Sequence, residues 1–158
     1  MGFNSFVLVD ISQNVDLIYL EEVMMGDFSF NMNYENRDKL LGISGEWIFK
    51  RGSGSIRRFD FIDVSILKQL IENKFIDPIE SHNSSPSIEQ IYGFMARFPH
   101  VMAKGYVTSP LRIDYRVSLD ALFVPKKHIT QQLKQDFIAF CVKADELETD
   151  EYLYAWWD

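Results

Sequence analysis

The most regular pattern of the chain lies between residues 101 and 120, where apolar and polar positions alternate. In its second half the apolar positions are Ile113, Tyr115, Val117 and Leu119, and the polar ones are Asp114, Arg116, Ser118 and Asp120. Because successive side chains of a strand point to opposite faces, the alternation predicts an inward apolar row and an outward, mostly charged row. The sequence TSP, at 108–110, predicts a turn from a preceding strand at 101–107.

Three other stretches carry strand patterns. Apolar residues alternate with Ser and Asn between 28 and 34, which predicts a half-buried strand. Two short apolar runs, at 47–49 and 56–61, flank the sequence RGSGS and predict a hairpin. A looser alternation over residues 1–10 predicts one more short strand.

The helix predictions rest on apolar stripes and on capping residues. Helices are predicted over residues 12–26, 64–74, 87–98 and 126–147. Asp63 stands where the N-cap of the second helix belongs, and Ser87 and Gln90 form a Ser-x-x-Gln capping box at the start of the third. The stripe of the fourth helix contains Ile129, Leu133, Phe137 and either Phe140 or Cys141.

Together these patterns predict about four helices and six strands, with the strands mostly in consecutive hairpins. Such an order favours an α+β fold, an antiparallel sheet with helices packed on it, over a doubly wound parallel sheet. A chain of 158 residues has the size of one domain, so residues 1–158 are predicted to form a single globular domain. Aromatic residues make up 15% of the chain, which is enough to fill a large core and to leave rings for contact surfaces.

The charge of the chain is −7 and is spread over both halves. A protein that binds nucleic acid non-specifically needs a positive field to neutralise phosphates, so a nucleic-acid partner is not expected. A negative charge instead steers a protein towards basic partners.

The sequence shows no long apolar segment and no secretion signal, so we expect no membrane partner and a cytoplasmic location. The single cysteine, Cys141, lies among apolar residues and excludes an intrachain disulfide and a cysteine-based zinc site. The histidines, His82, His100 and His128, have no metal-binding spacing. The sequence therefore predicts no catalytic residue, no metal and no cofactor, and leaves open whether the protein is an enzyme.

A basic cluster surrounds the glycines of the predicted hairpin. Its candidate ligand-binding residues are Lys50, Arg51, Ser53, Arg57 and Arg58. Glycines allow backbone N–H groups to turn towards an anion, and guanidinium groups can clamp a phosphate. The P-loop spacing is absent, so a small-anion or phosphate site at residues 50–58, in a binding or enzymatic domain, is one hypothesis and a flexible hairpin loop is the alternative.

The C-terminal sequence DELETDEYLYAWWD combines carboxylates with four large aromatic rings. In a strand, one face carries Tyr152, Tyr154 and Trp156, and the other face carries Leu153, Ala155 and Trp157. Both faces are apolar, so we expect both to be packed against other residues. One interpretation is that the segment closes the core, with the carboxylates in a solvated loop. The other is a contact surface for a protein partner, made of Glu146, Glu148, Asp150, Glu151, Tyr154 and Trp156.

Three functional hypotheses follow from these features. The first is a non-enzymatic binding protein that uses its acidic and aromatic surface to hold a basic protein or a second copy of itself. In composition alone, with no shared motif, the chain is similar to small acidic bacterial proteins that neutralise a partner, such as toxin-immunity proteins. The second hypothesis is the anion site at 50–58. The third is a winged helix that binds DNA, since two helices precede a hairpin, although Arg97 is the only cation on the expected reader helix.

Overall fold

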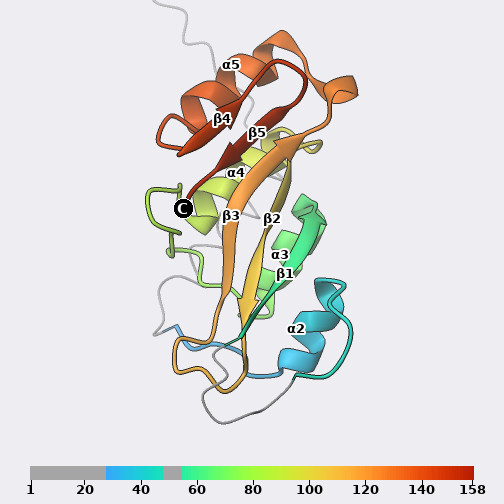
Figure 1. Cartoon of the computed structure of the whole chain (residues 1–158), viewed down its shortest axis with the longest axis vertical. Coiled ribbons are helices and arrows are strands. Elements are labelled where there is room, and N and C mark those ends of the chain that lie inside the picture. Colours follow the sequence, from blue (N-terminus) through green and yellow to red (C-terminus); the bar gives the residue numbers. More distant parts are fainter. Residues whose placement is uncertain (1–27, 48–54) are drawn as a thin grey trace, which may run out of the picture.

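The computed structural model describes residues 28–47 and 55–158. The helices of this part are α2 (Tyr34–Leu40), α3 (Val64–Glu72), α4 (Ile88–Arg97) and α5 (Gln131–Phe140), with a short 3-10 turn, η1, at Lys126–His128. The strands are β1 (Ile56–Ile62), β2 (Met102–Thr108), β3 (Val117–Val124), β4 (Glu146–Glu148) and β5 (Leu153–Trp156). The predicted α+β class is therefore confirmed (Figure 1).

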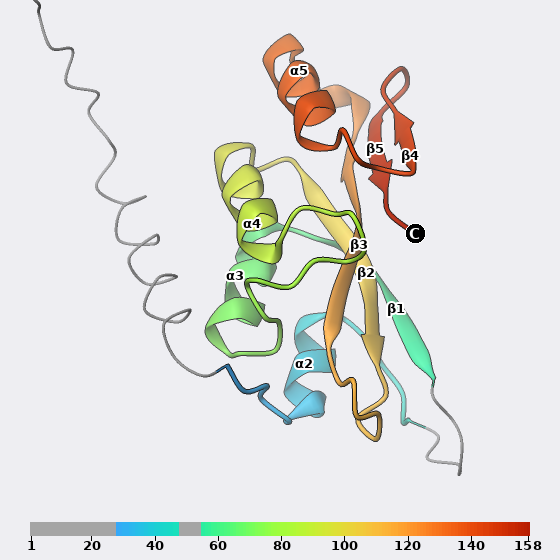
Figure 2. The same ribbon diagram turned by 90° about the vertical axis from the view of Figure 1, so that its left-hand side faces the viewer.

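The strands form one antiparallel sheet in the order β1-β2-β3-β5-β4. Figure 2 shows the described helices gathered on one side of this sheet, while its other side carries no described helix. We call the second side the open face. None of the described helices is long and apolar enough to cross a membrane.

The core lies between the sheet and the helices. The sheet contributes every second residue of its interior strands, and the buried ones include Ala103, Val107, Val117, Leu119, Leu122, Leu153 and Ala155. The helices contribute their apolar stripes, which include Leu67, Leu70, Ile91, Met95, Leu133 and Phe137. Cys141 belongs to the same cluster, as its apolar sequence context indicates.

The predicted helix starts are confirmed at two N-caps. The Asp63 side chain accepts a hydrogen bond from the backbone N–H of Ile66, and Ser87 and Gln90 make the reciprocal bonds of a capping box. Helix α5 is shorter than predicted at both ends. It begins after its own N-cap, Thr130, and the segment predicted as its last turn forms strand β4 instead, because pairing with β5 satisfies that backbone.

The strand predicted at 28–34 is wrong. Asn33 caps helix α2 by accepting a hydrogen bond from the backbone N–H of Asn36, so the chain turns into a helix where the alternation suggested extension. Phe30 still packs inward, against the ring of Tyr115 at 5.9 Å between centroids. The helix predicted at 12–26, the strand at 1–10 and most of the first hairpin arm, at 47–49, lie outside the described residues.

Strand β3 begins later than predicted and extends further, to Val124. Ile113 was expected to point inward, but it lies in the loop before β3 and is fully exposed. Asp120 was expected to point outward, but it is only 2% exposed. Lys104 pairs with Ala121 and Gly105 pairs with Leu119, so Asp120 is the extra residue of a β-bulge, and its carboxylate is buried against Arg58 on the open face.

Candidate functional site

The acidic C-terminal segment forms a β-hairpin at the edge of the sheet rather than a solvated loop. Strand β4 pairs with β5 so that Glu146 lies opposite Trp156 and Glu148 opposite Tyr154. Directly opposite residues of an antiparallel pair have their side chains on the same face. The hairpin therefore brings four of the six predicted partner-binding residues together on the open face.

The other two predicted residues lie in the turn of this hairpin. Asp150 and Glu151 are exposed there, and the carboxylate of Glu148 accepts a hydrogen bond from the backbone N–H of Asp150. Glu151 also accepts a bond of 3.0 Å from the ammonium group of Lys126. The turn thus extends the acidic surface beyond the strands, and Lys126 offsets one of its charges.

Rings from β1, β3 and the turn before β5 continue the surface. Tyr154 lies opposite Phe123 on β3, and Phe123 stacks on Phe61 of β1 with 4.7 Å between ring centroids. The ring of Tyr152 also packs against Phe123, with 5.6 Å between centroids. Lys104 places its ammonium group 5.1 Å from the ring centroid of Tyr154. We define the hairpin face as Glu146, Glu148, Tyr152, Tyr154 and Trp156.

The two adjacent tryptophans have different environments. Trp157 is 1% exposed and belongs to the core, together with Leu153 and Ala155. Trp156 is half-buried on the open face. The segment therefore both closes the core and presents rings on a surface, because alternate residues of one strand point to opposite sides of the sheet.

The predicted basic cluster is divided between the two faces of the sheet. Lys50, Arg51 and Ser53 lie outside the described residues. Arg57 points to the helix side, where its guanidinium group stacks on Trp47 at 4.4 Å and donates to the carbonyl oxygens of Ser44, Gly45 and Glu46. The side chains of Arg57 and Arg58 thus point to opposite faces of β1, although both residues line a cavity next to residues 41–44. An anion site formed by the whole cluster stays a prediction.

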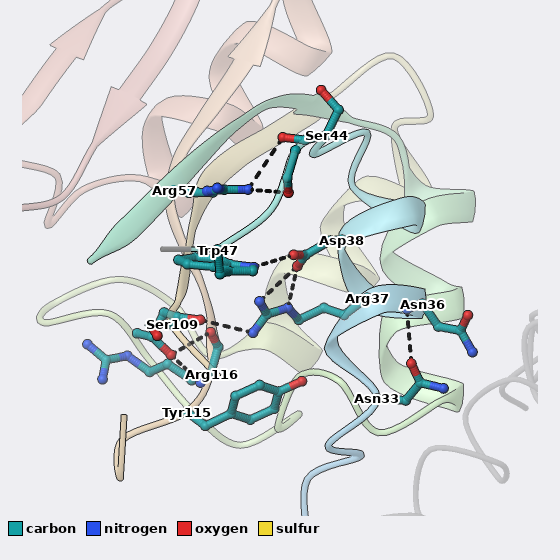
Figure 3. A network of polar contacts seen from close by, with 12 residues as sticks. Asn33, Asn36, Arg37, Asp38, Ser44, Trp47, Arg57, Ser109, Tyr115 and Arg116 are labelled. Atoms are coloured by element: carbon teal, nitrogen blue, oxygen red, sulfur yellow. Dashed lines mark hydrogen bonds and ion pairs between the residues drawn. The ribbon is translucent and has the colours of Figure 1, made fainter. Parts of the chain in front are cut away.

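Figure 3 shows the network of polar contacts beside Arg57. The indole N–H of Trp47 donates to Asp38 at 2.7 Å, and the Arg37 Nε donates to the other oxygen of the same carboxylate at 2.8 Å. Arg37 is fully buried and also donates to the carbonyl oxygen of Thr108, at 3.1 Å. This network links helix α2 and the loop that follows it to strands β1 and β2.

Arg58 points to the open face and binds the buried Asp120 of the bulge at 2.8 Å. There it lines a cavity of about 230 Å³, whose walls include His82, Tyr106, Arg116, Asp120 and Trp156. Sequence reasoning missed this cavity because its residues come from four separate segments. It missed likewise that the Nδ1 atom of His82 lies 3.1 Å from the hydroxyl oxygen of Ser118.

The charges beside the cavity are mostly paired. Asp114 accepts hydrogen bonds from Arg112, at 2.6 and 2.7 Å, and from Arg116, at 2.7 Å. These bonds hold the pKa of the Asp114 carboxyl well below its usual range, Arg112 having the largest effect. Glu80, on the loop that carries His82, has its pKa raised by burial, which the charge of Arg116 partly offsets.

The elements that suggested a winged helix are arranged differently. Strands β2 and β3 are interior strands of the sheet, each paired on both sides, and do not project as a wing. Arg97, at the end of α4, binds Asp136 of α5 at 2.7 Å. The nucleic-acid hypothesis gains no support from these contacts and stays a prediction.

The remaining histidines meet each other. His100 and His128 stack in parallel with 3.8 Å between ring centroids, although 28 positions separate them in the sequence. Within residues 28–47 and 55–158, no group of three or more His, Cys, Asp or Glu side chains is placed to hold a metal ion.

Comparison with other proteins adds no family to this description. No protein-family model, no curated protein and no solved structure matches the chain. The function is therefore argued from the geometry of the hairpin face and of the cavity beside it.

Proposed function

We propose that the protein is a non-enzymatic binding protein whose hairpin face holds a basic protein partner. The observation that carries the proposal is the pairing of β4 with β5, which sets Glu146 beside Trp156 and Glu148 beside Tyr154. Tyr and Trp rings supply much of the contact energy of protein interfaces, and carboxylates around them attract and orient a cationic partner.

Several features favour a basic partner over a second copy of the same chain. Two copies that met through this face would bring Glu146, Glu148 and Asp150 close to their own counterparts, and like charges across an interface are costly. The net charge of −7 adds to that repulsion. Lys104 already stacks on Tyr154, which illustrates how a lysine or arginine of the partner would lie against the rings.

The test is a capture experiment with charge-matched variants. The double variant Glu146→Lys, Glu148→Lys reverses the charge of the hairpin face. The control, Glu35→Lys with Glu72→Lys, makes the same change in net charge on helices α2 and α3. We expect the unchanged protein and the control to capture a basic protein that the hairpin variant does not hold.

A direct titration with a defined peptide does not require the natural partner to be known. A short peptide in which lysine alternates with valine should bind the unchanged protein, with an affinity that falls as salt rises. The hairpin variant should bind it at least about 10-fold more weakly. Equal binding by the hairpin variant and the control, in both experiments, contradicts the proposal.

A further inference from the structure

The cavity on the open face exists because strand β5 stops early. Strand β5 pairs with Ala121–Val124 and ends at Trp156, while β3 continues to Val117. Beyond Trp156, the loop between α3 and α4 reaches β3, where His82 contacts Ser118 at 3.1 Å. The cavity lies between the last residues of the chain, this loop and the side chains of β1 and β2.

Cationic and aromatic side chains converge on this space. Arg58, Arg112 and Arg116 line it, against the carboxylates of Asp120 and Asp158. Asp114, which pairs with Arg112 and Arg116, is not among the lining residues. Three guanidinium groups thus gather at one cavity of a protein whose net charge is −7, two of them paired with Asp114 and one with Asp120.

Among the arginines that line the cavity, Arg58 has the most hydrogen-bonding capacity left. Its side chain is 58% exposed, and within the described residues its only hydrogen bond goes from NH1 to Asp120. A guanidinium group has five N–H donors in a planar fork that matches the oxygens of a carboxylate or a phosphate. Asp120 holds one end of this fork in place, which leaves the remaining donors for a ligand.

The aromatic residues give the cavity flat walls. The guanidinium carbons of Arg58 and Arg116 lie 5.9 and 5.8 Å from the ring centroid of Tyr106, so two cations contact this ring. Its hydroxyl accepts a bond from Arg116 at 3.1 Å. Trp156 forms another wall and is only half-buried, so a planar group can pack on it.

We propose that this cavity binds a small organic anion that carries a planar ring. Its carboxylate or phosphate meets the free donors of Arg58, and its ring packs on Trp156. The site is distinct from the hairpin face in its charge, although both use Trp156, and the inference does not rest on the proposed protein partner.

The experiment titrates the protein with four probes by calorimetry. Indole-3-acetate and adenosine monophosphate represent the carboxylate and the phosphate source of the anion, and indole-3-acetamide and adenosine are their neutral counterparts. We expect one of the two anions to bind with a dissociation constant below about 1 mM and its neutral counterpart at least about 10-fold more weakly. The anion that binds identifies the source.

Variants locate the site. Arg58→Gln should weaken binding of that anion at least about 10-fold, whereas Arg97→Gln should leave it unchanged. Arg97 is a matched control because it is 61% exposed and also binds one carboxylate, that of Asp136. Since Arg58→Gln leaves Asp120 buried without its partner, Arg58→Lys is the variant that keeps a cation there, and we expect it to fold and to bind with intermediate affinity.

Three outcomes overturn the inference. They are no binding of either anion up to about 1 mM, equal binding of an anion and its neutral counterpart, and equal effects of the Arg58 and Arg97 variants. None of them bears on capture of a basic protein, which is measured with the Glu146 and Glu148 variants.

Discussion

Unfolding measurements on variants of the two adjacent tryptophans test which face of the sheet each side chain of β5 lies on. Trp157 is 1% exposed and packs in the core, whereas Trp156 is half-buried on the open face. Replacing each by alanine removes the same atoms from neighbouring positions of one strand. The two substitutions should therefore differ only through the face on which each side chain lies.

The expected magnitudes follow from the burial of each ring. A buried tryptophan removes roughly 200 Å² from water, which at about 25 cal/mol per Å² gives about 5 kcal/mol as an upper bound. Trp157→Ala should thus lower the free energy of unfolding by about 3–5 kcal/mol, a large part of the stability of a small domain. Trp156→Ala should lower it by about 1–2 kcal/mol, because part of its ring stays in water in the folded protein.

A third variant separates ring packing from the indole N–H group. The Nε1 atom of Trp157 is buried and has no hydrogen-bond partner within the described residues. Trp157→Phe keeps an aromatic ring in the core and removes this unpaired donor, so it should cost less than about 2 kcal/mol.

The assay is urea unfolding followed by far-ultraviolet circular dichroism, which does not depend on the tryptophan removed. With a slope of about 2 kcal/mol per M, a loss of about 4 kcal/mol moves the midpoint by about 2 M. If Trp156→Ala shifts the midpoint as much as Trp157→Ala does, the two faces of β5 are wrongly assigned, and the hairpin face with them.

Other features of the fold give three further predictions. A methyl group at Gly105 would lie 1.8 Å from the backbone oxygen of Ser118. Gly105→Ala should therefore destabilise the protein by about 3 kcal/mol. A urea midpoint equal to that of the unchanged protein would refute the bulge. Arg37→Met should cost about 3–5 kcal/mol, because the buried Asp38 loses its partner. The double variant Arg37→Met, Asp38→Asn should recover part of this loss in the same assay. Burial raises the pKa of the Cys141 thiol to about 12, so iodoacetamide at neutral pH should modify Cys141 only after unfolding, as mass spectrometry would show. Because the folded pKa is the higher one, the buried thiol favours folding at neutral pH, and this contribution is lost between about pH 8.5 and that value.

Interactions between residues close together in the chain could be predicted from the sequence. Asp63, Ser87 and Gln90 mark helix starts because each cap bonds to a backbone N–H three residues away, so the whole interaction lies within a few letters of sequence. Alternation likewise placed Tyr115, Val117 and Leu119 inside, and the order of hairpins and helices gave the α+β class. The alternation of apolar and polar residues gave a wrong strand around Asn33, which caps a helix instead. Whether such a side chain caps a helix or lies in an extended chain leaves no periodic pattern in the sequence.

What the sequence determined about the candidate sites was therefore their composition, and the tertiary structure decided which residues meet. Glu146 faces Trp156 only because β4 pairs with β5, and a short acidic segment carries no signal for that partner. Arg58 reaches Asp120 across 62 positions because β1, β2 and β3 lie side by side in one sheet. Arg57 faces away from its neighbour because a strand alternates its side chains. Pairing between strands far apart in the chain is fixed by the packing of the whole sheet, so only the folded protein reveals it.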